Sequence, residues 1–386
     1  MKKPLTSRAI FVAACLIAAS LQPCLSQAVA YVYVANASEI SGYSAAADGR
    51  LTAIPNMPVA ARVSHLSTTS KTVFGPGTDN KNIYSFNIGS NGTLTAGPVT
   101  NVQQYNTNGC PGTLGPTQVD FRGLYLYSLV IGIDCGSGIG THVFDIGSGG
   151  SLNHYNAWYT QIPHSGPPTP IRLLGTGNFA FLTGCSHNGT QYTPTTLIYN
   201  TVAPFPGGLY PFGTYTQAPE PSDPEDFFCP SRLAPDPSNH LAFAFRKFYP
   251  SIGKLSTPYF LASYTVDTQG RLSTQSNYIN MPAASIGTLS DMSISPGGNL
   301  LVVTGSYGFE LFRFNGGSPI TKITHLMASD PVVKSGWDKA GHLFVLTNSS
   351  LFVYNATTSG VQLAPGAPYP VSGDKPYSMI VRSPTN

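Results

Sequence analysis

Two arginines in similar sequence contexts are the residues of this chain best suited to hold an anion. Arg172 lies in the segment TPIRLLGTGN and Arg232 in CPSRLAPDPSN. Each segment is a short β-like run that leads into a turn rich in Gly, Pro or Asp, so we expect the arginines at equivalent positions of neighbouring repeat units. Two guanidinium groups that point into one cavity could clamp a carboxylate or a phosphate. The alternative is that each arginine pairs with a structural carboxylate such as Asp236.

His65 lies in a third segment of the same kind, RVSHLSTTSK, and is the histidine best placed to face the same cavity. The alternative for such a histidine is a packed, hydrogen-bonded position. The other histidines are scattered without the spacing of metal ligands. The chain has no P-loop, no Gly-x-Ser-x-Gly and no His-Glu-x-x-His. We therefore expect neither a metal nor a cofactor, and we assign no catalytic residue.

Residues 200–228 contain a concentration of aromatic side chains that departs from the repeat pattern. Tyr210, Phe212 and Tyr215 lie among prolines and glycines, and four acidic residues follow them. A long aromatic loop on a rigid scaffold is a common place for binding, and aromatic faces with carboxylates suit a sugar or a cation. The alternative is a lid that packs on its own repeat unit.

Segments like those of the two arginines recur along the chain and predict the fold. Seven of them can be recognised, which begin near Arg62, Gly115, Thr169, Cys229, Leu289, Val332 and Lys375. After most of them come a second run of β-branched and aromatic residues and a third run that ends at a Gly-containing turn. Units of this kind, repeated about every 40 to 60 residues, are typical of propeller blades. The sequence therefore predicts an all-β, seven-bladed β-propeller.

The seventh unit ends after one strand, and its missing strands stand at the other end of the chain. The N-terminal runs YVYVANAS, EISGYSAAADGRL and TAIPNMPV supply them. We expect residues 376–382 to pair beside residues 31–35, so that strands from both termini share one blade and the ring has no open edge. One propeller domain would then cover residues 31–386.

A family resemblance agrees with this organisation. YVYVANASEISGYSAAADGRLTAIPNMPV resembles the first blade of the seven-bladed lactonase-like family, which groups 6-phosphogluconolactonase with secreted and surface-layer propellers of YVTN-like repeats. LSDMSISPGGNLLVVTG is similar to the inner-strand motif of that family. The resemblance implies a propeller whose enzymes hold His, Arg and Glu at one mouth of the channel.

The residues that this resemblance implies for catalysis are only partly present. Arg172 matches the arginine of the family, but the strand after it ends in Gly184 and Cys185 where the carboxylate is expected, and GPTQVDFRG lacks the His-x-His. Opening a lactone needs a base as well as a cation. We therefore favour a non-catalytic propeller that presents loops to a small molecule, a glycan or an envelope protein. The alternative is a lactonase-type hydrolase with a diverged site.

The first thirty residues predict export. Lys2, Lys3 and Arg8 precede an apolar run of about a dozen residues, and Ala-Val-Ala ends the segment, which is the pattern of a cleavable signal peptide at residues 1–30. The run is too short to span a bilayer. We expect a secreted or periplasmic monomer without a transmembrane anchor.

The charge balance of the remaining chain excludes one class of partner. Without the three cations of the signal segment, 17 of the 20 Lys and Arg residues remain against 17 Asp and Glu. A nucleic-acid binder needs a basic surplus, so we expect no nucleic-acid partner. A net charge of zero also gives no preference for the sign of a ligand.

Four cysteines remain after the signal segment, which in an exported chain suggests two disulfides. Cys135 and Cys185 each end a second strand, whereas Cys110 and Cys229 each lie just before an inner strand. These positions share one face of the disc, so we favour Cys110–Cys135 and Cys185–Cys229. The other pairings, and four free thiols, remain alternatives.

Overall fold

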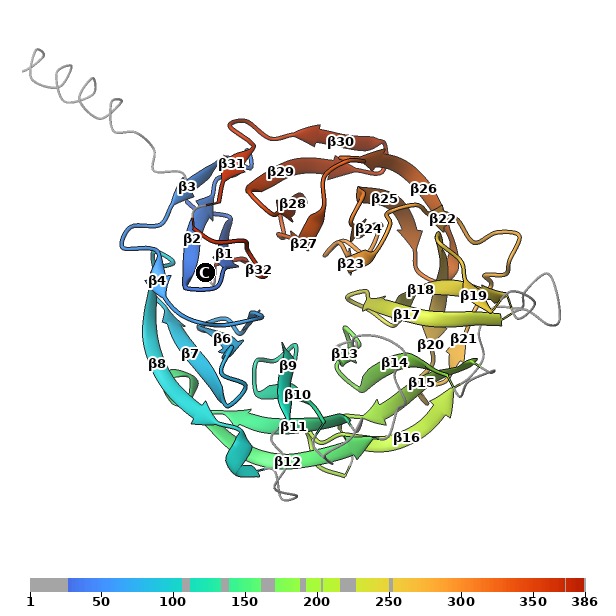
Figure 1. Ribbon diagram of the computed structural model, residues 1–386, viewed down its shortest axis with the longest axis horizontal. Coiled ribbons are helices and arrows are strands. Elements are labelled where there is room, and N and C mark those ends of the chain that lie inside the picture. Colours follow the sequence, from blue (N-terminus) through green and yellow to red (C-terminus); the bar gives the residue numbers. More distant parts are fainter. Residues whose placement is uncertain are drawn as a thin grey trace, which may run out of the picture.

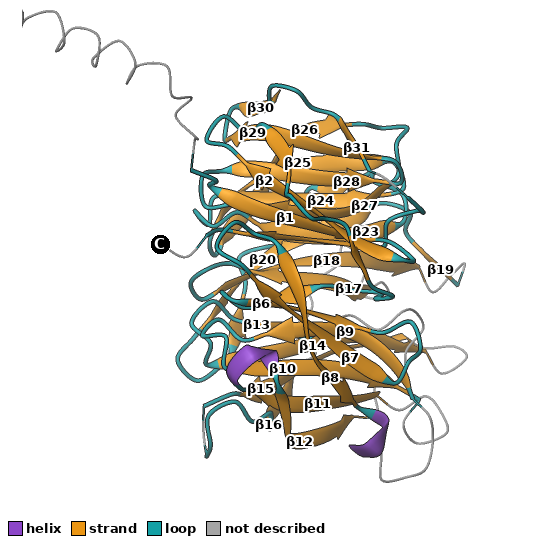
Figure 2. Cartoon of the chain, turned by 90° about the vertical axis from the view of Figure 1, so that its left-hand side faces the viewer, coloured by secondary structure: helices purple, strands orange, loops and turns teal. Residues whose placement is uncertain are grey.

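The computed structural model describes residues 27–105, 112–132, 139–160, 171–187, 192–202, 204–215, 227–249, 253–371 and 373–384. Over these residues the chain forms seven antiparallel sheets, which stand as blades in a ring (Figure 1). Residues of all seven blades line a cavity at the centre of this ring, which we call the channel. Seen from the edge, the blades lie side by side and form a disc (Figure 2). The prediction of an all-β, seven-bladed propeller is confirmed.

We number the blades from the one that closes the ring, and give the strands of each from the channel outward. Blade 1 contains β32 (Ser378–Arg382), β1 (Ala30–Ala35), β2 (Glu39–Ala45), β3 (Leu51–Ala53) and β4 (Val59–Ala60). Blade 2 contains β5 (Ser67–Thr68), β6 (Thr72–Pro76), β7 (Asn82–Ile88) and β8 (Leu94–Asn101). Blade 3 contains β9 (Thr113–Val119), β10 (Tyr125–Ile131), β11 (Ile139–Ile146) and β12 (Leu152–Thr160). Blade 4 contains β13 (Arg172–Leu173), β14 (Phe179–His187), β15 (Tyr192–Asn200) and β16 (Tyr210–Tyr215).

The remaining blades follow the same plan, some with short extra strands. Blade 5 contains β17 (Phe227–Pro235), β18 (His240–Tyr249), β19 (Lys254–Leu255), β20 (Tyr259–Val266), β21 (Leu272–Ser273) and β22 (Ala283–Ala284). Blade 6 contains β23 (Leu289–Ile294), β24 (Leu300–Gly305), β25 (Gly308–Asn315) and β26 (Ser318–Leu326). Blade 7 contains β27 (Val332–Trp337), β28 (His342–Thr347), β29 (Ser350–Thr357), β30 (Gly360–Leu363) and β31 (Tyr369–Pro370). Two 3₁₀ turns, η1 (Gln103–Tyr105) and η2 (Ser148–Gly150), lie outside the sheets.

The ring closes through blade 1, as the sequence predicts. β1 pairs with β32 in antiparallel register from Tyr31 opposite Arg382 to Ala35 opposite Ser378. Strands from the two ends of the chain therefore lie in one sheet. The sheet order β3-β2-β1-β32 places the C-terminal strand next to the channel.

Side chains packed between neighbouring sheets hold the blades together. The second strands β24 (LLVVTG) and β28 (HLFVLT) are buried along their whole length. One apolar cluster joins Val32 of blade 1 to Phe344 and Val353 of blade 7. Because both faces of a blade are covered, these strands contain continuous apolar runs, LLVV and LFVL, rather than alternating ones.

The fold begins close to the predicted end of the signal segment. β1 starts at Ala30, and the N–H of Val29 donates to the carbonyl of Ala45. The strand thus starts one residue before the expected boundary, and residues 1–26 lie outside the described part of the chain. Within that part, no helix has the length and apolar character needed to cross a membrane.

A glycine permits a close approach between the turns of blades 4 and 5. A Cβ atom on Gly175 would overlap with the backbone of Asp236 and Pro237. We expect Gly175→Ala to lower the free energy of unfolding by about 3 kcal/mol, because backbone atoms cannot move aside as a flexible side chain can. Gly213→Ala is the control, since a Cβ atom there has no neighbour within 4 Å among the described residues. Equal stability of the two variants in chemical denaturation would contradict this packing.

Candidate active or binding site in the central channel

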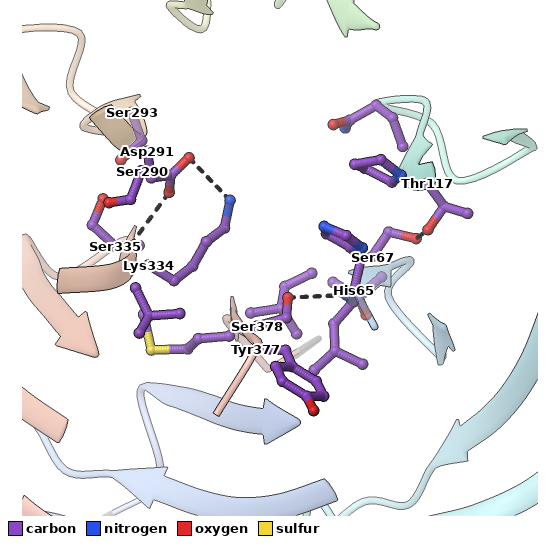
Figure 3. A pocket seen from close by; sticks show the side chains of 18 of the residues that line it. His65, Ser67, Thr117, Ser290, Asp291, Ser293, Lys334, Ser335, Tyr377 and Ser378 are labelled. Carbon is purple, nitrogen blue, oxygen red and sulfur yellow. Dashed lines mark hydrogen bonds and ion pairs between the residues drawn. The ribbon is translucent and has the colours of Figure 1, made fainter. Parts of the chain in front are cut away.

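The channel contains a cavity of about 570 Å³ to which all seven blades contribute residues. Its lining comes from the inner strands β5, β9, β13, β17, β23, β27 and β32 and the residues beside them. The sequence places His65, Arg172 and Arg232 in this channel, and all three line the cavity. Figure 3 shows part of this wall, with Asp291 and Lys334 on one side and His65 on the other.

Asp291 of blade 6 is the charge around which the cations gather. Its Oδ1 atom lies 3.0 Å from Lys334 Nζ, 3.5 Å from Arg232 Nη1 and 3.9 Å from Arg172 Nη2. Its Oδ2 atom accepts a hydrogen bond of 3.3 Å from the N–H of Ser335. The Asp291 side chain is 3% exposed. Four blades thus bring three cations to one buried carboxylate.

Burial and charge act in opposite directions on these groups. Burial would raise the pKa of Asp291, but the nearby cations, Lys334 first, hold that pKa below its usual range. Burial lowers the pKa of the Lys334 ammonium, and the two arginines lower it further, while Asp291 opposes both effects. Burial likewise lowers the pKa of Arg172. With the three cations and Asp291 charged, the cavity carries a formal excess of two positive charges.

A repeated backbone feature aims three of the four charged groups. In blades 5, 6 and 7 the inner strand has one extra residue immediately before the charged residue, which is Arg232, Asp291 or Lys334. Such a β-bulge changes the direction in which the next side chain points. Each of the three lies four residues before the residue that opens the following turn, which is Asp236, Ser295 or Asp338. The same place in three consecutive blades therefore supplies the cluster.

Arg172 does not occupy that place, so the expected equivalence of the two arginines is wrong. Its turn opens at Leu174, whose N–H donates to Phe179, and Arg172 is only two residues before it. Arg232 lies four residues before its own turn. An offset of two residues keeps a side chain on the same face of a strand and moves it about 7 Å along it. Both guanidinium groups therefore still reach Asp291, and neither pairs with Asp236, whose partner is His240 at 2.9 Å.

The sequence reasoning missed Asp291 and Lys334. Both lie in inner-strand segments that it identified, LSDMSISPGGN and VVKSGWDKAGH. Each lies four residues before the turn that follows it, as Arg232 does, and this shared spacing marks the three as equivalent positions. Their contact requires three neighbouring blades and is not visible in any single repeat.

Several polar atoms in this wall have no partner among the described residues. Arg232 Nε, Ser293 Oγ and Ser335 Oγ are buried and make no hydrogen bond there. All three residues line the cavity. Buried polar groups without partners cost free energy, so a polar ligand in the cavity would relieve that cost.

His65 faces the cluster as a neutral imidazole. Burial lowers its pKa to about 4, with smaller contributions from Lys334 and Arg232. Its Nδ1 atom lies 3.2 Å from Ser64 Oγ. At neutral pH the ring is therefore uncharged and only weakly basic.

His65 should make the stability of the protein depend on pH. The unfolded chain binds the proton near pH 6.5 and the folded chain only near pH 4, so protons favour unfolding. The stability that depends on a neutral His65 is fully present above pH 6.5 and is lost as the pH decreases from 6.5 to 4. We expect His65→Gln to lose less stability than the wild type over this range; His142, whose pKa burial also lowers to about 4, keeps part of the slope. Denaturation curves at several pH values, with an NMR titration of His65, measure this, and identical slopes for both proteins would contradict it.

The aromatic residues singled out in the sequence lie away from the channel. Tyr210–Tyr215 is β16, the outermost strand of blade 4, so this part of the segment is not an insertion into the repeat. Tyr210 packs edge-on against Trp158, and Phe212, 48% exposed, packs edge-on against Phe179. The backbone of Tyr215 pairs with Thr196. Neither Tyr210 nor Phe212 lines the channel cavity, and the acidic residues that follow lie outside the described part.

One predicted disulfide is confirmed. Cys185 of β14 and Cys229 of β17 are bonded, with Cα atoms 5.5 Å apart. The bond joins blade 4 to blade 5. Cys110 and Cys135 lie outside the described residues. Within the described ranges, no group of three or more His, Cys, Asp or Glu side chains is placed to hold a metal ion.

The fold of this chain is similar to that of several solved structures. No family model matches the chain, and no curated protein is similar to it in sequence. A proposed 6-phosphogluconolactonase from Bacteroides fragilis is similar in structure, with 14% identity over 93% of this chain and 99% of that one and a TM-score of 0.64. A protein from Lactobacillus plantarum has 15% identity over 92% and 99% of the two chains and a TM-score of 0.63. A hypothetical selenium-binding protein from Sulfolobus tokodaii has 10% identity over 92% and 93% and a TM-score of 0.62. The chain therefore has the fold of the 6-phosphogluconolactonase-like seven-bladed propellers, as the resemblance implied.

Proposed function

We propose that this protein binds a small dianion, such as a phosphate monoester or a dicarboxylate, in its central channel. The observation that supports this most strongly is the cluster of Arg172, Arg232 and Lys334 around the single carboxylate of Asp291. The carboxylate of Asp291 offsets one of the three cations, so a ligand with two negative charges would neutralise the two positive charges that remain. The zero net charge of the chain outside the signal segment conceals this local excess.

The unpartnered atoms of the wall suit the same ligand. Arg232 Nε is a charged donor without a partner in the described part of the channel, and the hydroxyls of Ser293 and Ser335 can each donate or accept. Charge-assisted hydrogen bonds to phosphate or carboxylate oxygens are roughly twice as strong as neutral ones. A dianion with oxygen acceptors would therefore satisfy both the charge and the open donors.

We favour binding over hydrolysis because neither His65 nor Asp291 is an effective base at neutral pH. A general base works best with a pKa near the working pH. The pKa of His65 is lowered to about 4 and that of Asp291 is held below its usual range, so both are weak bases at neutral pH. The cations could stabilise an oxyanion.

A lactone hydrolase is the second candidate. The similarity in fold to a proposed 6-phosphogluconolactonase, together with a neutral imidazole opposite three cations, supports it. We expect the purified protein to hydrolyse 6-phosphogluconolactone no faster than the spontaneous reaction. Turnover that depends on the protein and is abolished by Arg172→Ala would favour the hydrolase instead.

Calorimetric titration tests the proposed binding. We expect phosphate or succinate to bind at least tenfold more tightly than acetate, since one carboxylate leaves half of the excess charge uncompensated. Arg232→Gln should weaken the binding of the dianion at least tenfold. Arg313→Gln is the control, because Arg313 is an exposed cation on the third strand of blade 6. Equal affinity for monoanions and dianions, or an equal loss in both variants, would contradict the proposal.

We also propose that this binding takes place outside the cytoplasm, in a secreted or periplasmic protein. The basic and apolar pattern of residues 1–30 supports export, and the Cys185–Cys229 bond suits an oxidising compartment. N-terminal sequencing of the mature protein from its host would test this: a chain that still begins at Met1 in the cytoplasm would contradict it.

A further inference from the structure

The Cys185–Cys229 disulfide joins the two blades that carry the channel arginines. Cys185 lies on β14, the second strand of the blade of Arg172, and Cys229 lies on β17, the strand of Arg232. The two blades are separate sheets that pack against each other through β14 and β17. The bond is therefore a covalent tie across an interface that is otherwise formed by side-chain packing.

The position of Arg232 depends strongly on the backbone of β17. Cys229 is three residues before Arg232, and the β-bulge of the strand lies between them. Arg232 Nε makes no hydrogen bond within the described residues, and its Nη1 reaches Asp291 at 3.5 Å. Arg172, in contrast, is also held by a hydrogen bond of 3.3 Å from Nη1 to Gln118 Oε1. A displacement of β17 would therefore move Arg232 more readily than Arg172.

Electrostatic repulsion favours such a displacement. Arg172 and Arg232 approach the same carboxylate oxygen from neighbouring blades, and Lys334 approaches it from a third. With more cations than carboxylates in the cavity, repulsion between the like charges would act against the positions of Arg172 and Arg232 when no anion is bound. An empty site keeps its geometry only if the surrounding scaffold is rigid enough to resist this.

We propose that the Cys185–Cys229 disulfide is a positioning element of the anion site. It holds β17 against β14, and so keeps Arg232 in the channel beside Arg172 before the ligand arrives. This inference rests on the proposed binding of a dianion, and it adds that the site works fully only in the oxidised protein.

A double-mutant cycle with inorganic phosphate tests the proposal on the mature, oxidised chain. We expect the double variant Cys185→Ser/Cys229→Ser to bind phosphate about tenfold more weakly than the wild type. In an Arg232→Gln background the same two substitutions should change the affinity less than twofold, because the residue that they displace is already gone. In an Arg172→Gln background the loss should remain several-fold. Equal losses in the Arg232→Gln and wild-type backgrounds would overturn the proposal.

A loss of affinity caused by general destabilisation of the fold must be distinguished from one caused by displacement of Arg232. Val353→Ala removes buried methyl groups from the third strand of blade 7, away from the channel, and is the control. All variants are compared at a temperature at which circular dichroism shows them folded. Val353→Ala should retain wild-type affinity for phosphate. An affinity loss equal to that of Cys185→Ser/Cys229→Ser (the serine variant) would overturn the proposal.

A readout without ligand separates this inference from the proposed function. The pKa of His65 is lowered first by burial and then by Lys334 and Arg232. If Arg232 moves away in the serine variant, the His65 titration followed by NMR should shift upward from about pH 4. A wild-type protein that binds no dianion would contradict the proposed function. Wild-type binding with an unchanged His65 titration and unchanged affinity in the serine variant would overturn the positioning role alone.

Discussion

Replacing Asp291 by Asn should lower the free energy of unfolding by about 3 kcal/mol at neutral pH, and added phosphate should restore most of it. The substitution leaves Arg172, Arg232 and Lys334 around a group without charge, and removing one partner of a buried ion cluster commonly costs this much. Phosphate at about a hundred times its dissociation constant would return about 2.7 kcal/mol by binding only the folded state. Urea denaturation with and without phosphate measures both effects.

Asp236→Asn is the matched control for this result. The Asp236 side chain is 5% exposed, against 3% for Asp291, and accepts hydrogen bonds from the N–H groups of Ser238 and His240, both at 2.9 Å. It lies in a turn and does not line the channel cavity. We expect Asp236→Asn to be destabilised without any recovery in phosphate. If phosphate restored the free energy of unfolding of both variants, or of neither, a specific anion site formed by the cations around Asp291 would be contradicted.

The pH dependence of the Asp291 contribution has a defined sign. Its pKa in the folded protein is held below the ordinary carboxyl value of 3.8. The stability that it contributes is therefore present above about pH 4 and is lost as the pH falls through the folded pKa. The loss of stability caused by Asp291→Asn should consequently shrink in acid, and a constant difference between the two proteins down to pH 2 would contradict this.

Removing residues 377–386 should abolish cooperative folding of the whole propeller. This deletion takes away β32, which pairs with β1 over five residues and supplies Met379 to the core between blades 1 and 7. It also removes the Ser378 hydroxyl, which accepts a hydrogen bond of 3.1 Å from the N–H of Leu66 in blade 2. The ring would then have an open edge along β1. We expect a loss of at least about 5 kcal/mol, comparable with the total stability of a domain.

Thermal unfolding and size-exclusion chromatography measure the effect of the deletion. A chain shortened only by Thr385 and Asn386, which follow the described C-terminus, is the control and should behave as the wild type. A chain without residues 377–386 that stays monomeric and unfolds at the wild-type temperature would show that closure of the ring contributes little.

The sequence by itself determined the architecture, because each blade is built from local signals. Apolar runs, Gly-containing turns and their repetition predict seven sheets, and the unfinished seventh unit predicts the pairing of residues 376–382 with residues 31–35 that β32 and β1 confirm. The Cys185–Cys229 pairing was favoured from the sequence, since strand direction places these cysteines on one face of the disc, and the structure confirms it. His65, Arg172 and Arg232 reach the channel because they lie on or beside inner strands.

Only the tertiary structure decided what these residues do together. Arg172, Arg232, Asp291 and Lys334 come from four blades, and adjacent members of this set are separated by more than forty residues along the chain. Contacts at such separations depend on the closed ring, so a repeat pattern cannot reveal that one carboxylate is shared by three cations. The direction of three of these side chains also depends on β-bulges, and a single extra residue in a strand leaves little trace in composition. The net charge of the chain sums over all its residues, whereas the folded channel gathers three cations around one carboxylate in one buried place.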